Sequence, residues 1–355
     1  MESQAARVAA TQPAPLVTSQ GPRAARSVPI WQLSLAFWLL FLAVLGAHAL
    51  KLGNVAQLTT FGVIFASIVI EALPFILLGA LVSAAVAVFV PDRFFARVGS
   101  LPRHLQLPGA TLAGFAFPVC ECGSVPIGRR LIARGVHPSA GLGFMFSAPV
   151  LNPIVLISTW VAFGGGTRGA EMVAGRATLG FIVAMTAGFV IAGRDTPLLR
   201  QDPPANRSEP CADGHEHHDV AEDRGGAFVG HLIGDLLFMS RFLMLGAAAS
   251  ALMQTFVPQN ILSGVAGAAV IGILALMAFA FMLALCSEAD AFVATSFTAF
   301  PLSAQLGFLV FGPIFDAKLA AIYGATFRPP FIRRLLIVAV PVVLVGALLF
   351  GAIVT

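Results

Sequence analysis

The sequence contains few charged residues. Only 11% of its 355 residues are Asp, Glu, Lys or Arg, whereas 58% are hydrophobic and the mean hydropathy is +0.89. This composition excludes an ordinary soluble domain and predicts a protein embedded in a membrane. The formal net charge of +4 is small, and the arginines flank apolar runs instead of forming one patch. We therefore expect the lipid bilayer, and no nucleic acid, as a partner.

Three further patterns are missing. The apolar runs lack the alternation typical of membrane β-barrels, so we expect helices to cross the membrane. The glycine run at 164–166 is not followed by Lys-Ser or Lys-Thr, so the chain has no phosphate-binding P-loop and does not use ATP directly. The four cysteines form no recognisable disulfide framework. No cofactor and no enzymatic activity are expected.

The sequence is organised around residues 117–126, which read FPVCECGSVP. Two prolines and a glycine frame two cysteines and a carboxylate here. Because proline removes a backbone donor, a helix that enters at about Thr111 should break near Cys120. Within a bilayer, broken backbone is tolerated only where protein or a water-filled cavity covers it. The motif therefore predicts part of a cavity wall.

An internal repeat relates the two halves of the chain. The register pairs residues 75–84 with 242–251, Cys122 with Cys286, Pro149 with Pro313, and Asn152 with Asp316. Any two apolar helices look alike, but chance similarity does not keep a cysteine, a proline and a polar residue in one frame. The sequence thus predicts two structurally equivalent copies.

Each copy should contain a long helix, a helix that ends at the cysteine region, and two more helices. The expected ranges are 59–90, 108–122, 137–163 and 171–191 in the first copy, and 228–257, 261–286, 301–324 and 331–353 in the second. If the cysteine segments enter and return on one side, each copy crosses the membrane three times and the second copy is inverted. With one more helix near the N-terminus, seven crossings result.

We predict an all-α polytopic membrane protein, with two inverted repeats that contain broken or re-entrant helices and with one extra N-terminal helix. Its expected parts are a disordered segment (1–29), an extra transmembrane helix and loop (30–58), membrane repeat 1 (59–193), a His-containing cytoplasmic linker (194–227) and membrane repeat 2 (228–355). Arginine clusters after the first long helix, after the cysteine motif and before the last helix place those loops in the cytoplasm.

Three thiols are candidate substrate ligands: Cys120, Cys122 and Cys286. If the copies face each other across a pseudo-two-fold axis, these thiols converge on one cavity. Soft thiolates select soft ions such as Cu(I) or Zn(II), and the same softness suits trivalent arsenic or antimony. The alternative is that these cysteines are small apolar residues of buried helices.

Ionisable side chains also interrupt the apolar runs. A charge at the bilayer centre costs about 2.5 to 3.5 kcal/mol on insertion scales, so such groups suggest function. They could exchange protons for substrate. For Glu71, a structural pair with an arginine is an equal alternative, and Asp316 and Lys318, two apart on a helix, should not face each other. The candidate site residues in this group are Glu121, Asn152 (the counterpart of Asp316), Glu288, Asp290 and Asp316.

The linker carries His215, His217 and His218 close to Cys211. These histidines could bind Zn, Ni or Cu, although their spacing matches no fixed tetrahedral module. A solvated acidic linker is the alternative interpretation.

Two motifs resemble those of the ArsP/YraQ group of predicted bacterial permeases. They are Pro118-x-Cys120-x-Cys122 followed by Pro126, and Ser147-x-Pro149-x-x-Asn152-Pro153, and the similarity extends from about Thr59 to the C-terminus. The resemblance implies a multi-pass permease of the bacterial inner (plasma) membrane. Some members export trivalent organoarsenicals with the help of cysteines, a role that would fall here on Cys120 and Cys122.

These observations together predict a secondary permease for a small molecule or ion, which exports a soft metalloid or another thiophilic solute. Two rival hypotheses remain open. One is a membrane thiol-disulfide electron carrier that uses Cys122 and Cys286. The other is a metal cation transporter that depends only on the carboxylates and the histidine tract.

Overall fold

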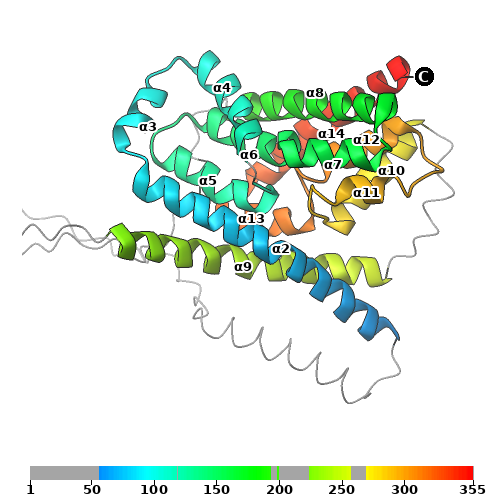
Figure 1. Cartoon of the computed structure of the whole chain (residues 1–355), viewed down its shortest axis with the longest axis horizontal. Coiled ribbons are helices and arrows are strands. Elements are labelled where there is room, and N and C mark those ends of the chain that lie inside the picture. The colour runs from blue at the N-terminus through cyan, green and yellow to red at the C-terminus, as the bar shows by residue number, and fades with distance from the viewer. Residues whose placement is uncertain (1–55, 118, 193–197, 200–223, 257–268, 355) are drawn as a thin grey trace, which may run out of the picture. The chain divides into compact units, whose positions relative to one another are not determined.

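Figure 1 shows a computed structural model of the chain, which describes residues 56–117, 119–192, 198–199, 224–256 and 269–354. All the named secondary-structure elements in these ranges are α-helices. Five helical stretches are long and apolar enough to cross a bilayer: Thr59–Phe89, Pro138–Ala162, Gly166–Ile191, Phe228–Thr255 and Pro330–Val354. The protein is therefore an all-α, multi-pass membrane protein, as the sequence predicted. The extra helix predicted near the N-terminus falls outside the described ranges.

The helices of the first copy are α2 (Ala56–Phe89), α3 (Asp92–Gly99), α4 (Arg103–Ala116), α5 (Glu121–Ala133), α6 (Pro138–Leu151), α7 (Pro153–Ala162) and α8 (Gly166–Ile191). The 14 residues of α4 extend about 21 Å, which is too short to cross about 30 Å of hydrocarbon. Phe117 and Cys120 both have extended backbones, and α5 begins at Glu121. The predicted break near Cys120 is confirmed.

The second copy contains α9 (Arg224–Phe256), α10 (Ala269–Leu283), α11 (Asp290–Ala294), α12 (Leu302–Phe311), α13 (Ala317–Thr326) and α14 (Pro330–Val354). α12, α13 and α14 begin 164 residues after α6, α7 and α8, respectively. The same interval separates Cys122 from Cys286 and Asn152 from Asp316. The 164-residue interval that aligns the two copies in the sequence therefore also relates the positions of their helices.

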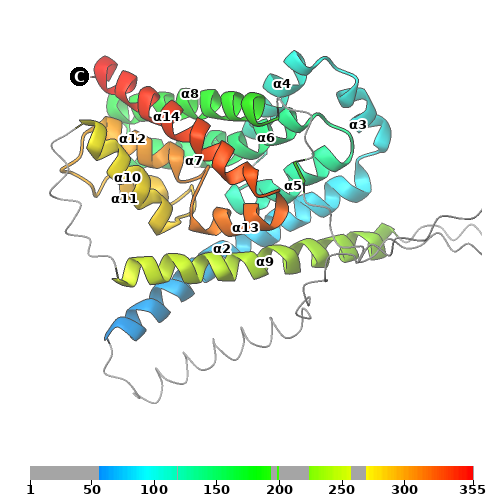
Figure 2. The same cartoon turned by 180° about the vertical axis from the view of Figure 1, so that it is seen from behind.

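The two copies also pack in the same way internally. In the first copy α4, α6 and α8 contact one another, and in the second copy α10, α12 and α14 do the same. The equivalent long helices α2 and α9 lie side by side, and Figures 1 and 2 show that their chains run in opposite directions. The second copy is therefore inverted relative to the first.

Two helices expected to be continuous are interrupted. The predicted helix 137–163 is divided at Asn152 into α6 and α7, and the predicted helix 301–324 is divided into α12 and α13. Pro153 disfavours helical backbone at the residue before it, and Asn152 accordingly takes φ −51° and ψ 130°. Asp316, its counterpart, is also extended, with φ −134° and ψ 179°. Each copy therefore has two helix breaks where the sequence suggested one.

Two equivalent glycines bring the long helices close to the broken segments. At Gly79, α2 meets the backbone of Gly123 in α5, and at Gly246, α9 meets the backbone of Lys318 in α13. A Cβ atom at either glycine would overlap the facing Cα atom. The backbones can approach this closely only because no side chain lies between them.

We predict that Gly246→Ala lowers the thermal stability of the purified protein. The added methyl group overlaps the backbone of Lys318, and such overpacking typically costs about 1 to 3 kcal/mol. Gly234→Ala is the matched control, because it lies in the same helix and a Cβ there meets open space. Thermal unfolding in detergent measures both variants. Equal melting temperatures for the two would contradict the close contact between α9 and α13.

Candidate functional site

The helix breaks of the two copies meet at Glu121. This residue begins α5, directly after the first break, and only 1% of its surface is exposed. Lys318 Nζ in α13 donates to its Oε1 over 3.1 Å, and Ser287 Oγ, in the break after α10, donates to its Oε2 over 3.1 Å. Both partners belong to the second copy and are fully buried. One carboxylate of the first copy is thus held by two groups of the second.

A second buried ion pair lies next to the first. Arg176 of α8 donates two hydrogen bonds to the carboxylate of Asp290, over 2.8 and 2.7 Å. Its guanidinium also donates to Thr159 Oγ1 over 2.9 Å and to the carbonyl oxygen of Ser287 over 3.2 Å. Ser287 therefore contacts both pairs, through its hydroxyl on one side and its carbonyl on the other.

We call Glu121, Arg176, Asp290, Asp316 and Lys318 the buried charge cluster. Three carboxylates face two cations in it, and Lys318 Nζ lies 3.7 Å from Asp316 Oδ2 in addition to its contact with Glu121. Charges in a membrane interior persist when they are paired and hydrogen-bonded in this way. The carboxylates predicted at 121, 290 and 316 thus share one site.

Asn152 and Asp316 have the same structural role in the two copies. Asn152 Oδ1 accepts from the N–H of Ile154 over 2.9 Å, and Asp316 Oδ1 accepts from the N–H of Leu319 over 2.6 Å, so each caps the helix after its break. The second polar atom of each side chain, Asn152 Nδ2 and Asp316 Oδ2, is buried and forms no hydrogen bond with the residues that the structure describes. Such atoms are unusual in folded proteins and can bind water or a polar ligand.

The thiols of both copies lie beside these groups. Cys120, Cys122 and Cys286 are buried and free. Cys122 follows Glu121 in sequence and Cys286 precedes Ser287, so the hydrogen bond between Glu121 and Ser287 joins the two cysteine segments. Across the described residues, no three His, Cys, Asp or Glu side chains are arranged to hold a metal ion.

The other predicted site residues differ in placement. Glu288 is half-buried, and its Oε2 has no hydrogen-bond partner within the described part of the chain. His215, His217 and His218 lie outside the described residues, so their metal binding stays a prediction.

The sequence analysis missed Arg176, and its expectation that Lys318 and Asp316 do not face each other was wrong. Arg176 is an arginine in the middle of a 26-residue apolar helix, which is itself a signal of function that could have been used. Lys318 and Asp316 were expected not to face each other because both were placed on a helix. Asp316 instead precedes α13 in an extended conformation, which turns its carboxylate toward Lys318.

We predict that Arg176→Met strongly destabilises the protein, because it leaves the Asp290 carboxylate buried without its cation. Breaking a buried pair in this way costs about 3 to 5 kcal/mol, whereas the double variant Arg176→Met/Asp290→Asn should recover part of that loss. Arg130→Met is the control. Its pair with Asp235 is equally short, but about a fifth of each side chain is exposed (19% and 21%), so its loss should cost less than the loss of Arg176. If the melting temperature fell equally in Arg176→Met and Arg130→Met, burial would not account for the greater importance of the Arg176–Asp290 pair.

Three comparisons place the chain among known proteins. A family model described as a predicted permease, ArsP_1, matches residues 57–352. The UPF0718 protein YcgR of Bacillus subtilis is 38% identical over 289 residues, which cover 81% of this chain and 95% of that protein. A Streptococcus mutans protein, named as a subunit of a two-component membrane permease complex, is 32% identical over 292 residues, which cover 81% and 94% of the two chains. No solved structure matches.

The comparisons and the structure agree on a membrane transporter. The matched region begins within α2 and ends within α14, so it contains both repeats and the buried charge cluster. The resemblance noted from the cysteine and asparagine motifs is thereby confirmed. The chain belongs to the ArsP_1 family of predicted permeases.

Proposed function

We propose that this protein is a secondary permease that exports a soft metalloid or another thiophilic solute, such as a trivalent organoarsenical. One observation supports this proposal above the others. Broken helices from both inverted copies bring buried, free thiols next to a paired cluster of charges. Inverted-repeat transporters bind substrate at such discontinuous helices, near the middle of the bilayer.

The thiols supply the chemistry for a soft solute. A trivalent arsenical that carries a hydroxyl group can exchange it for a thiol: the arsenic–oxygen bond breaks, an arsenic–sulfur bond forms, and the thiol proton leaves with the hydroxide as water. No electron is transferred, and the reverse reaction with water releases the solute. A transport site must release what it binds, and a few thiols on interrupted helices suit this better than a rigid cage of four ligands.

The charge cluster supports passage of a polar solute through the same place. Its cations and carboxylates neutralise one another in large part. Asn152 Nδ2 has no hydrogen bond to the described residues and could contact a bound molecule, and Asp316 Oδ2 could do so beside its ion pair with Lys318. Proton exchange through these carboxylates stays a prediction. A pH gradient imposed in the vesicle assay below tests this prediction. The rate of uptake changes with the gradient if transport is coupled to protons, and it stays the same if transport is uncoupled.

The decisive experiment measures uptake of a trivalent methylarsenical into everted vesicles, or into liposomes that hold only this chain. We expect Cys122→Ser and Cys286→Ser to reduce transport by at least about 10-fold, because each removes a soft ligand from the site. Cys211→Ser is the matched control and should transport normally, since Cys211 belongs to the linker between the repeats. Transport in the liposomes would also show that no second subunit is required.

The outcomes separate the hypotheses. Normal transport by Cys122→Ser and Cys286→Ser would refute the thiol mechanism while leaving the family assignment intact. A disulfide between Cys122 and Cys286 that forms in cells and is reduced by a thioredoxin-like partner would favour the electron carrier. Metal-dependent phenotypes that persist in a cysteine-free variant would favour the cation transporter.

A further inference from the structure

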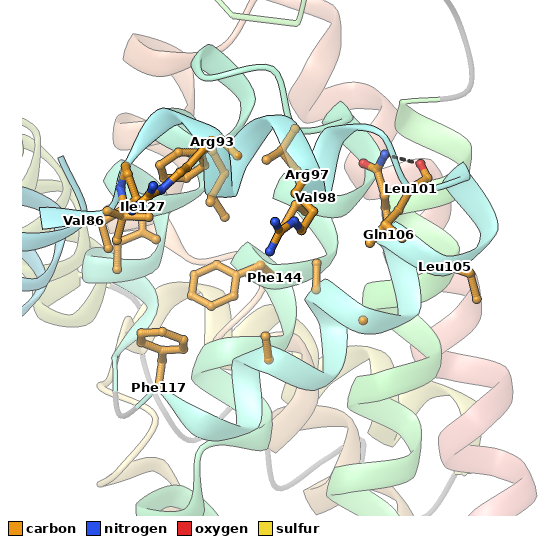
Figure 3. Close-up of a pocket in the computed structure, with 18 of the residues that line it drawn as sticks. Val86, Arg93, Arg97, Val98, Leu101, Leu105, Gln106, Phe117, Ile127 and Phe144 are labelled. Carbon is orange, nitrogen blue, oxygen red and sulfur yellow. Dashed lines mark hydrogen bonds between the residues drawn. The ribbon is translucent and has the colours of Figure 1, made fainter.

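A large pocket lies apart from the buried charge cluster. It occupies about 900 Å³ between the end of α2, α3, α4 and α5, and no residue of the cluster lines it. Most of its wall is apolar, with Val86, Phe89, Ala113, Leu131 and Phe144 among the residues that contribute. Val86 and Phe144 are labelled in Figure 3. Its volume falls in the upper part of the range for small-molecule sites, about 300 to 1,000 Å³.

Two arginines give this apolar pocket a polar edge. Arg93 and Arg97 are four residues apart on the short helix α3, so they lie on one face of it, and both line the pocket. Figure 3 shows the side chain of Arg97 directed toward Phe144. Both arginines are exposed, and neither forms an ion pair with any residue that the structure describes. Among the described residues, these two positive charges therefore have no carboxylate partner, and they lie beside the apolar wall of the pocket.

A nearby arginine, in contrast, is held by contacts within the protein. Arg134, at the end of α5, donates to the carbonyl oxygens of Ala87 and Val90, and its guanidinium lies 4.9 Å from the ring centre of Phe95. Phe95 is buried and faces the protein from α3. Arg134 thus connects α5 to the end of α2 and to α3. Arg93 and Arg97 have no comparable ion pair among the described residues and are available to a ligand.

We propose that this pocket binds an anionic phospholipid, with the phosphate on Arg93 and Arg97 and the acyl chains along the apolar wall. Guanidinium groups bind phosphate through paired hydrogen bonds, and basic pockets among membrane helices bind anionic head groups. A free phosphate could contact the arginines, but it would leave the apolar wall uncovered. The bilayer itself supplies a ligand that satisfies both. The proposal does not depend on which solute the protein transports.

The pocket is placed to influence the candidate transport site. Ile127 and Leu131 of α5 line it, and α5 begins with Glu121, the carboxylate that joins the two copies. Phe117, in the break before α5, also lines it. A bound lipid would therefore contact the helix and the break that position Glu121.

The test uses the full-length, delipidated protein in detergent and counts bound lipids by native mass spectrometry. Phosphatidylglycerol and phosphatidylcholine with identical acyl chains are compared. We expect tighter binding of phosphatidylglycerol to the wild type, and about 25-fold weaker binding to the Arg93→Ala/Arg97→Ala variant, at about 5-fold for each basic residue. Arg333→Ala, which removes an exposed arginine outside the pocket, should bind as the wild type does.

A second variant and a competitor complete the test. Ala113→Trp fills the pocket and should weaken binding of both lipids, while its melting temperature reports whether it is folded. Inorganic phosphate at millimolar concentration should not displace phosphatidylglycerol. Displacement by phosphate, equal affinity of the wild type for the two lipids, or unchanged phosphatidylglycerol binding by the double arginine variant would each overturn the proposal.

Discussion

The central constraint on this structure is that charges buried within a membrane must be paired. Glu121, Lys318, Arg176 and Asp290 are almost completely inaccessible, and each would be costly to bury alone. Their pairing requires that the break after α4, the break after α10 and the start of α13 meet at one place. The interrupted helices and the inverted arrangement of the copies thus both serve to bring the buried charges of the site into pairs.

The scaffold is symmetric, but its chemistry is not. In the repeat register Glu121 corresponds to Leu285, Lys318 to Ile154, Arg176 to Val340 and Asp290 to Pro126. Each charge therefore has a non-ionisable residue at the equivalent position of the other copy. Three ion pairs join a residue of the first copy to one of the second: Glu121–Lys318, Arg176–Asp290 and Arg130–Asp235. Electrostatic attraction thus holds the two copies together, and any movement of one against the other must preserve or exchange these contacts.

Much of the fold could be predicted because the signals are local or repeated. Apolar length predicted the long helices, proline and glycine predicted the break at Cys120, and the shared cysteine, proline and polar positions predicted the inverted repeat. The break at Asn152 was missed because its apolar surroundings suggested one continuous helix. Arg176 and the partner of Lys318 were missed for another reason. A repeat comparison reveals residues that the copies share, whereas these charges occur in one copy only and find their partners through the tertiary structure.

The most direct measurement is a density map, at side-chain resolution, of the protein in a lipid nanodisc. Our account predicts that α4 and α10 end inside the bilayer and that the side chain of Glu121 lies between those of Lys318 and Ser287. Continuous helices through residues 117–120 and 284–289 that face lipid, with Glu121 and Lys318 apart, would contradict it.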